Sequence, residues 1–124
     1  MTKGAALHEF FNRLQGIPAY PETDVPRGAG FPRMTYSVPV GAWGGSEEAL
    51  TISMWFKTES EAIPNAKAQE LSELIGAGGV LLPCDGGAIW VKRGAPWCQS
   101  LTDESDSTLK RRYINVSVEY ITLN

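Results

Sequence analysis

The sequence is poor in the residues that most often carry enzyme chemistry. Its 124 residues include one histidine and two cysteines, which are too few for a disulfide framework or for a zinc site built from these residues alone. It contains no nucleophile elbow, Walker loop, HExxH, CxxC or calcium-loop motif. We therefore predict that the protein is not an enzyme, and we expect no cofactor and no bound metal.

Long apolar runs and an excess of positive charge are also lacking. No run approaches the roughly 20 apolar residues that span a bilayer, and the N-terminal stretch has no signal-peptide pattern. The net charge of −3 and the pI of about 5.1 argue against a protein that coats nucleic acid, although a local basic patch remains compatible with them. We expect a protein that is made and used in the cytoplasm, without a membrane partner.

The remaining composition is typical of one folded domain. Hydrophobic residues make up 43% of the chain and charged residues 20%, so we predict a single α+β domain over residues 1–124. Leu7, Phe10, Phe11 and Leu14 follow the spacing of one helix face.

A second helix is predicted over 59–76, with Ser60 as its N-cap, acidic residues in its first turn and Gly76 at its end. Alternating or short apolar runs predict strands over 33–40, 50–58, 80–84, 88–93 and 110–123.

This order of helix, strand, strand, helix, strand, strand, strand predicts a mainly antiparallel sheet of about five strands with both helices packed on one face. The other face, which carries Ser53, Trp55, Ser117 and Glu119, is semi-polar and is expected to meet either solvent or another subunit. Residues 18–32 hold four prolines and predict an extended surface connection.

The two cysteines lie in a glycine-rich stretch, 78–99. The Asp85-Gly86 pair predicts a hairpin turn, because both residue types tolerate positive φ. Cys84 and Cys98 are interpreted as reduced, partly buried thiols. The alternative is a small thiol-dependent enzyme with its site at Cys84, Asp85 and Cys98. His8 is expected on the solvated surface of the first helix.

Two kinds of residue are candidates for a subunit interface. Lys92, Arg93, Lys110, Arg111 and Arg112 end one predicted strand and begin another, so antiparallel pairing could bring them together. They would then bridge subunits, contact DNA or simply remain solvated edge charges.

Trp43 and Trp97 lie in turn-rich segments, where a tryptophan either anchors an interface or folds back over its own sheet. For Trp55 and Trp90, which lie within strands, we expect burial in the domain. The acidic segment 103–106 is interpreted as a solvated loop, with a metal site as the less favoured reading.

Five stretches carry a family resemblance in a fixed order along nearly the whole chain: GIPAYPETDVP, FPRMTYSVPVGAWG, TISMWFKTESEA, IGAGGVLLPCDGGAIWVKRGAPWCQ and KRRYINVSVEYIT. Together they resemble the minor capsid and tail terminator (tail completion) proteins of tailed bacteriophages. The resemblance consists of hydrophobic patterns and turn signatures, and it assigns no role to any single residue.

The resemblance implies a structural virion protein of a phage or prophage, located in the tail or neck and assembled in the bacterial cytoplasm. Tail terminators have an antiparallel sheet with helices on one side and close into a six-membered ring. They join the tail-tube protein to the head–tail connector and so stop tube growth. DNA contact would be at most transient, in the lumen of the ring. The alternative in the same class is another neck or head-completion protein.

Overall fold

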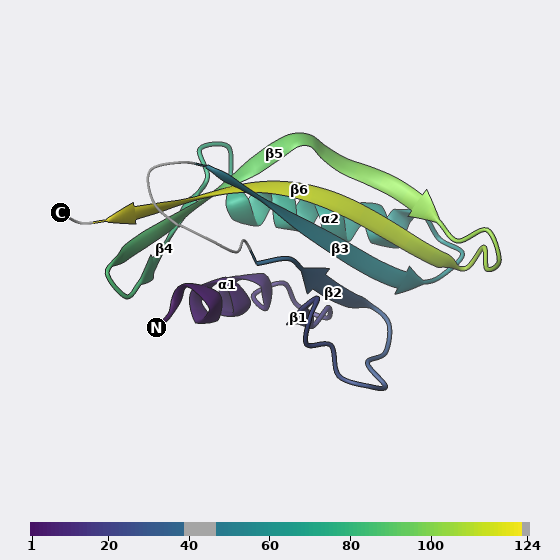
Figure 1. Cartoon of the computed structure of the whole chain (residues 1–124). Coiled ribbons are helices and arrows are strands. Elements are labelled where there is room, and N and C mark those ends of the chain that lie inside the picture. The colour runs from purple at the N-terminus through teal and green to yellow at the C-terminus, as the bar shows by residue number, and fades with distance from the viewer. Residues whose placement is uncertain (39–46, 123–124) are drawn as a thin grey trace.

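The chain folds into one six-stranded sheet with two helices, and the computed structural model describes residues 1–38 and 47–122. The elements are α1 (Lys3–Phe11), β1 (Ala19–Pro21), β2 (Arg33–Tyr36), β3 (Glu48–Lys57), α2 (Ala62–Ile75), β4 (Val80–Cys84), β5 (Gly87–Thr102) and β6 (Leu109–Thr122). The strand order is β1-β2-β3-β6-β5-β4, with β1 parallel to β2 and the other described pairs antiparallel (Figure 1). The predicted α+β class is therefore confirmed, with one strand more than expected.

The additional strand, β1, lies within the segment that was expected to be only a surface connection. Ala19 pairs with Met34 and Pro21 with Tyr36. The Asn12 side chain fixes this short strand at its start, because it accepts a hydrogen bond from the Ala19 N–H and donates one to the Ala19 carbonyl. A three-residue strand ending in proline is too short to show alternation, which is why the sequence pattern did not reveal it.

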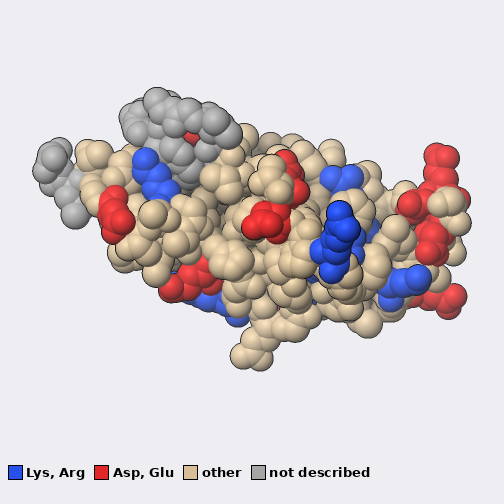
Figure 2. Space-filling view, turned by 60° about the horizontal axis from the view of Figure 1, so that its bottom comes forward, with Lys and Arg blue, Asp and Glu red and all other residues tan. Residues whose placement is uncertain are grey.

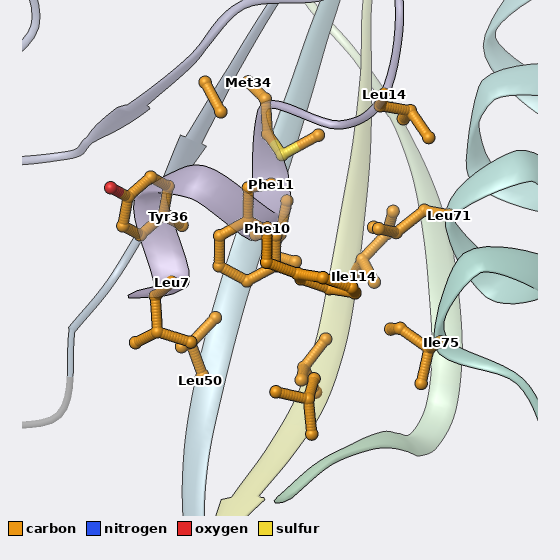
Figure 3. Packing of buried hydrophobic residues seen from close by; sticks show 14 of the residues in the cluster. Leu7, Phe10, Phe11, Leu14, Met34, Tyr36, Leu50, Leu71, Ile75 and Ile114 are labelled. Atoms are coloured by element: carbon orange, nitrogen blue, oxygen red, sulfur yellow. The ribbon is translucent and has the colours of Figure 1, made fainter. Parts of the chain in front are cut away.

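Both helices cover the same face of the sheet, as predicted. Figure 3 shows Leu7 and Phe10 of α1 and Leu71 and Ile75 of α2 directed toward a common core, with Ile114 of β6 between them. All five side chains are essentially inaccessible to solvent. We call this covered side of the sheet the inner face.

Helix α1 also explains why the sheet curls. It lies against both edge strands, β1 and β4, so the two ends of the sheet bend toward one helix (Figure 1). The segment before α1 is attached to the β4–β5 turn, since the Met1 ammonium donates to the Asp85 carboxylate at 2.8 Å and the Asp85 N–H donates to the Met1 carbonyl at 2.7 Å. In that turn only Gly86, at φ 82°, takes a positive φ. The turn therefore needs a positive φ at the glycine and not at Asp85.

Helix α2 begins differently from the sequence expectation and ends as expected. Its N-cap position is Glu61, which makes no capping side-chain bond, and its first turn holds no acidic residue. Ser60 instead accepts a hydrogen bond from the Ala62 N–H at 3.1 Å. Gly76, at φ 83°, terminates the helix. No helix in the described ranges has the length and apolar character needed to cross a membrane.

Strand β5 is longer than predicted, because the segment after Arg93 continues the strand. The pairing with β6 shifts register between Arg93 and Cys98, where a β-bulge contains Pro96. A bulge is a place where a strand tolerates proline, since the hydrogen-bonded ladder is already interrupted there. Gly94 is required at this point because a Cβ atom there would lie 2.6 Å from the Asn115 carbonyl oxygen.

Candidate interaction surface

The side of the sheet opposite the helices, here called the outer face, carries a row of four residues from four neighbouring strands. Arg33 of β2 is paired with Trp55 of β3, Trp55 with Arg111 of β6, and Arg111 with Leu101 of β5. We call these four residues the outer-face row. Their alignment follows from the antiparallel register, because side chains directly opposite each other project on the same face.

The two arginines bracket the indole of Trp55. The Arg111 guanidinium carbon lies 4.7 Å from the centre of the Trp55 ring, and that of Arg33 lies 6.0 Å from it. Arg33 also lies 4.5 Å from the Phe31 ring, and Arg111 lies 5.2 Å from the Tyr113 ring. Such cation–π contacts hold a guanidinium in place without neutralising its charge.

The hydrogen-bond partners of these arginines are neutral oxygens. Arg33 donates to the Ala29 carbonyl at 3.1 Å, and Arg111 donates to the Ser53 hydroxyl at 2.9 and 3.1 Å. Among the described residues, no carboxylate forms an ion pair with either guanidinium. The outer face therefore presents two oriented, uncompensated positive charges on either side of an aromatic ring.

Two hollows adjoin on the outer face and share Trp55 and Arg111 as lining residues. One, of about 370 Å³, also includes Arg33 and is bordered by Glu22 and Val25 from the β1–β2 connection. The other, of about 350 Å³, extends along β5 and β6 past Leu101, which is 40% exposed, to Asp103. This arrangement suits recognition of a carboxylate or another planar anion with a neighbouring apolar group.

The five basic residues predicted as one interface group are not brought together. In the β5–β6 pairing, Lys92 and Arg93 lie opposite Ser117 and Val116. Val116 is four residues along β6 from Arg112, which corresponds to about 13 Å at the usual strand rise, and Ser117 is one residue farther. The expectation that antiparallel pairing would bring the two groups into one patch was wrong, because β5 extends well beyond Arg93.

Alternation along β6 also divides the group between the two faces. Lys110 and Arg112 point to the inner face, where the Arg112 guanidinium, only 1% exposed, donates to the Asn65 side chain at 3.0 and 3.2 Å and pairs with Glu61. Lys110 also pairs with Glu61, at 3.6 Å. These two residues attach the start of α2 to the sheet.

The other members of the group have separate partners. Arg93 donates to the Ser72 carbonyl near the end of α2 at 2.7 and 3.0 Å. Lys92, on the outer face, pairs with Glu47 and lies 4.2 Å from the Trp90 ring centre. Arg111 is therefore the one residue of the predicted group that adds an unpaired charge to the outer face within the described ranges.

The tryptophans differ in their surroundings. Trp97 is half-buried in the β5 bulge and packs against the core, whereas Trp43 lies outside the described residues. Trp90 and Trp55 were expected to be buried, but both are only half-buried on the outer face. The Trp90 indole N–H donates to the Gly78 carbonyl at 2.9 Å, and that of Trp55 to the Thr35 hydroxyl at 3.3 Å.

The residues proposed for a thiol site do not form one. Cys84 lies opposite Gly87, which pairs with Thr122, whereas Cys98 pairs with Ile114. The two thiols are thus about 26 Å apart along β6. Burial raises the pKa of both Cys84 and Cys98, so neither is an activated thiolate.

The single histidine, His8, is exposed on α1 as predicted and is hydrogen-bonded through Nδ1 to the Tyr36 hydroxyl at 2.9 Å. Its hydrogen bonds and ring contacts in the described structure are with Tyr36 and Asn12, and none is with a cysteine.

The acidic β5–β6 loop forms one end of the molecule. Figure 2 shows red side chains gathered at the end where Figure 1 places this loop, while the basic side chains on the same view lie in separate groups. Hydrogen bonds from Ser105 lower the pKa of Asp103, and those from Thr108 lower the pKa of Asp106. Nowhere in 1–38 or 47–122 do three potential ligand side chains gather closely enough to hold a metal ion.

Sequence reasoning missed Arg33 and underestimated Trp55. Trp55 was placed correctly on the face opposite the core, but its burial was overestimated. The signal for Arg33 was its position just before the inward Met34, which puts it on the outer face by alternation.

Comparison of the chain with models of known protein families found no match, and no curated protein matches it.

Proposed function

We propose that the protein is a structural component of a tailed-phage virion, namely a tail terminator that forms a ring at the head–tail junction. In this role one copy contacts the next around the ring, the tail-tube protein on one side and the connector on the other. The ring stops growth of the tail tube and joins tail to head. The protein would act through its surfaces and perform no chemistry.

The observation that carries the proposal is the outer-face row. A monomeric protein has no evident use for two arginines held beside Trp55 with only neutral hydrogen-bond partners. A partner with complementary charge would turn these residues into an interface, and tryptophan and arginine are the residue types most enriched at interface hot spots. The inner face is already covered by α1 and α2, which leaves the outer face for a neighbour.

The fold gives a second line of support. The sequence resemblance implies an antiparallel sheet with helices on one side, and the chain has that architecture. The long β5–β6 hairpin, which extends to one end of the molecule in Figure 1, supplies a projecting element of the kind a ring subunit needs for contact with its neighbour.

The thiol-enzyme alternative receives no such support. Its three residues are split between the β4–β5 turn and the far part of β5, and burial raises the pKa of both thiols.

Electron microscopy of negatively stained particles tests the proposal. Purified protein is imaged alone and after mixing with tail tubes from the phage or prophage that encodes it, and tubes without added protein serve as the control. We expect rings that cap one end of each tube, hold tubes at a fixed length and allow them to join heads.

Two outcomes would contradict this. Binding to DNA-filled heads but not to tubes would place the protein on the head side of the junction, as a head-completion protein. Binding to neither, together with a monomer at every concentration, would overturn a structural role in the virion.

A further inference from the structure

We infer that the hollow around Arg33, Trp55 and Arg111 receives the acidic β5–β6 loop of a second copy of this chain. This inference rests on the proposed ring and specifies which two surfaces form the contact between neighbouring subunits. The docking surface is the outer-face row. The docked element is the loop that carries Asp103, Glu104 and Asp106.

The charges of the two surfaces are complementary, and neither surface forms an ion pair within the described part of one copy. Neither Arg33 nor Arg111 has a carboxylate partner among the described residues, and none of the three loop carboxylates forms an ion pair there. A guanidinium beside a carboxylate forms paired, charge-assisted hydrogen bonds, which are about twice as strong as neutral ones. Contact between copies would supply each surface with what it lacks.

Within the loop, Glu104 is the carboxylate available for such a contact. Asp103 accepts hydrogen bonds from the Ser105 N–H and hydroxyl at 2.8 and 2.6 Å, and Asp106 accepts from Thr108 at 2.9 and 2.6 Å. These bonds fix the conformation of the loop. Glu104 lies between them, is exposed, and has no hydrogen bond in the described structure. The loop is therefore shaped by two carboxylates and presents the third.

The surroundings of the hollow favour a protein loop over nucleic acid. Only two unpaired guanidiniums line it, and Glu22 borders one hollow while Asp103 borders the other. A polyanion would extend over these carboxylates, whereas a loop tip needs only the space between them. The volume of about 370 Å³ beside Arg33 is larger than one glutamate residue occupies.

The two surfaces are different patches that adjoin, because Asp103 also lines the hollow beside Arg111. The contact runs head to tail, since each copy gives its loop to one neighbour and receives the loop of the other. The loop forms one end of the β5–β6 hairpin (Figure 1), and the row crosses four strands on the outer face. A contact between two different patches repeats from copy to copy and produces a closed ring when the rotation per step closes. The same contact would produce an open filament if the rotation did not close.

Charge exchange between the two surfaces tests the inference. Self-association is measured by sedimentation velocity over a concentration series for the wild type, Arg111→Glu, Glu104→Lys and the double variant. Where wild-type copies associate only on tail tubes, the fraction of capped tubes is measured instead. We expect each single variant to weaken association about thirtyfold or more, as expected for loss of one partner of an interfacial charge pair. The double variant should recover much of it.

Matched charge changes elsewhere serve as controls. Arg13→Glu, just after α1, and Glu73→Lys on α2 make the same changes of charge at exposed positions outside both surfaces, and we expect little effect on association. Arg111→Gln removes the charge without reversing it and should give an intermediate loss. Near-UV circular dichroism of every variant establishes that the fold is retained.

The outcomes separate the two proposals. Rings that persist unchanged in both single variants would overturn the docking inference and leave the ring itself in place. A wild type that remains monomeric and caps no tubes would overturn the proposed function as well. If Arg111→Glu abolished binding to DNA and left self-association unchanged, the hollow would be a phosphate site and the docking inference would be wrong.

Discussion

Arg111 and Arg112 are neighbours in sequence and have opposite surroundings. Arg112 lies on the inner face beneath the start of α2, is 1% exposed, and is bonded to Asn65 and Glu61. Arg111 lies on the outer face against Trp55, with the Ser53 hydroxyl as its side-chain hydrogen-bond partner. The difference arises from strand geometry, because successive residues of a β-strand point to opposite faces.

This comparison separates a structural role from an interaction role for the same residue type. A buried guanidinium needs hydrogen-bond acceptors and an opposite charge, because leaving a buried charge without a partner costs roughly 3–5 kcal/mol of stability. An exposed-face guanidinium that is held in place but not neutralised retains its capacity to bind an anion. The inner arginine therefore holds α2 on the sheet, and the outer one is available to a partner.

The largest expected effect is on the free energy of unfolding of Arg112→Ala. This substitution removes the packing and the hydrogen bonds beneath α2, and we expect a loss of about 3 kcal/mol. Arg111→Ala should cost about 1 kcal/mol or less, because the two hydrogen bonds that it removes share one acceptor, the Ser53 hydroxyl, and its contacts with the Trp55 and Tyr113 rings are at a half-exposed position.

Urea unfolding followed by circular dichroism, at a concentration where copies do not associate, measures both. Equal losses for the two variants would contradict the division between an inner structural arginine and an outer interaction arginine. Arg112→Lys, which retains the charge with a different donor geometry, should fall between the wild type and the alanine variant.

Much of the fold followed from periodicity in the sequence. Ile52 and Met54 were expected on the core side and Ser53 and Trp55 on the other, and the structure has them so. The same alternation, extended backward from Ile114, places Arg112 and Lys110 on the inner face. They were instead grouped with Arg111, because charged residues are seldom buried and a run of three basic residues suggests a surface patch.

The candidate site was less accessible to sequence reasoning, since it depends on register between strands. The alternation of β2 indicates that Arg33 faces outward, but its position beside Trp55 follows only from the pairing of Arg33 with that residue. Likewise, the alignment of Leu101 with Arg111 depends on the bulge in β5. No local pattern indicates how many residues a bulge inserts, so distances across the sheet could not be predicted.

A smaller effect is expected from the pH dependence of the inner-face ion pairs. Hydrogen bonding from Arg112, together with its charge and that of Lys110, lowers the pKa of Glu61 below its ordinary value of 4.5. A lowered folded-state pKa contributes stability at pH values above the unfolded pKa, and this contribution is lost as the pH falls through the folded pKa. The wild type should therefore lose stability on acidification below about pH 4.5 more steeply than Glu61→Gln.

Thermal unfolding at a series of pH values measures this difference directly. Asp103 and Asp106 also have lowered pKa values, but they are present in both proteins and cancel in the comparison. A Glu61→Gln variant whose stability falls in parallel with that of the wild type would show that the pairing with Arg112 contributes nothing.

The smallest expected effect concerns the two thiols and tests how well the inner face excludes solvent. Cys98 pairs with the inward Ile114 and Cys84 ends β4, and burial raises the pKa of both. Each thiol therefore carries less thiolate near neutral pH than a free cysteine, and iodoacetamide should alkylate both more slowly in the folded protein than in the urea-unfolded chain. If the proposed ring forms, the Cys84→Ser/Cys98→Ser variant should form it as the wild type does. A thiol that reacts faster in the folded state would instead indicate an activating neighbour and restore the thiol-enzyme alternative.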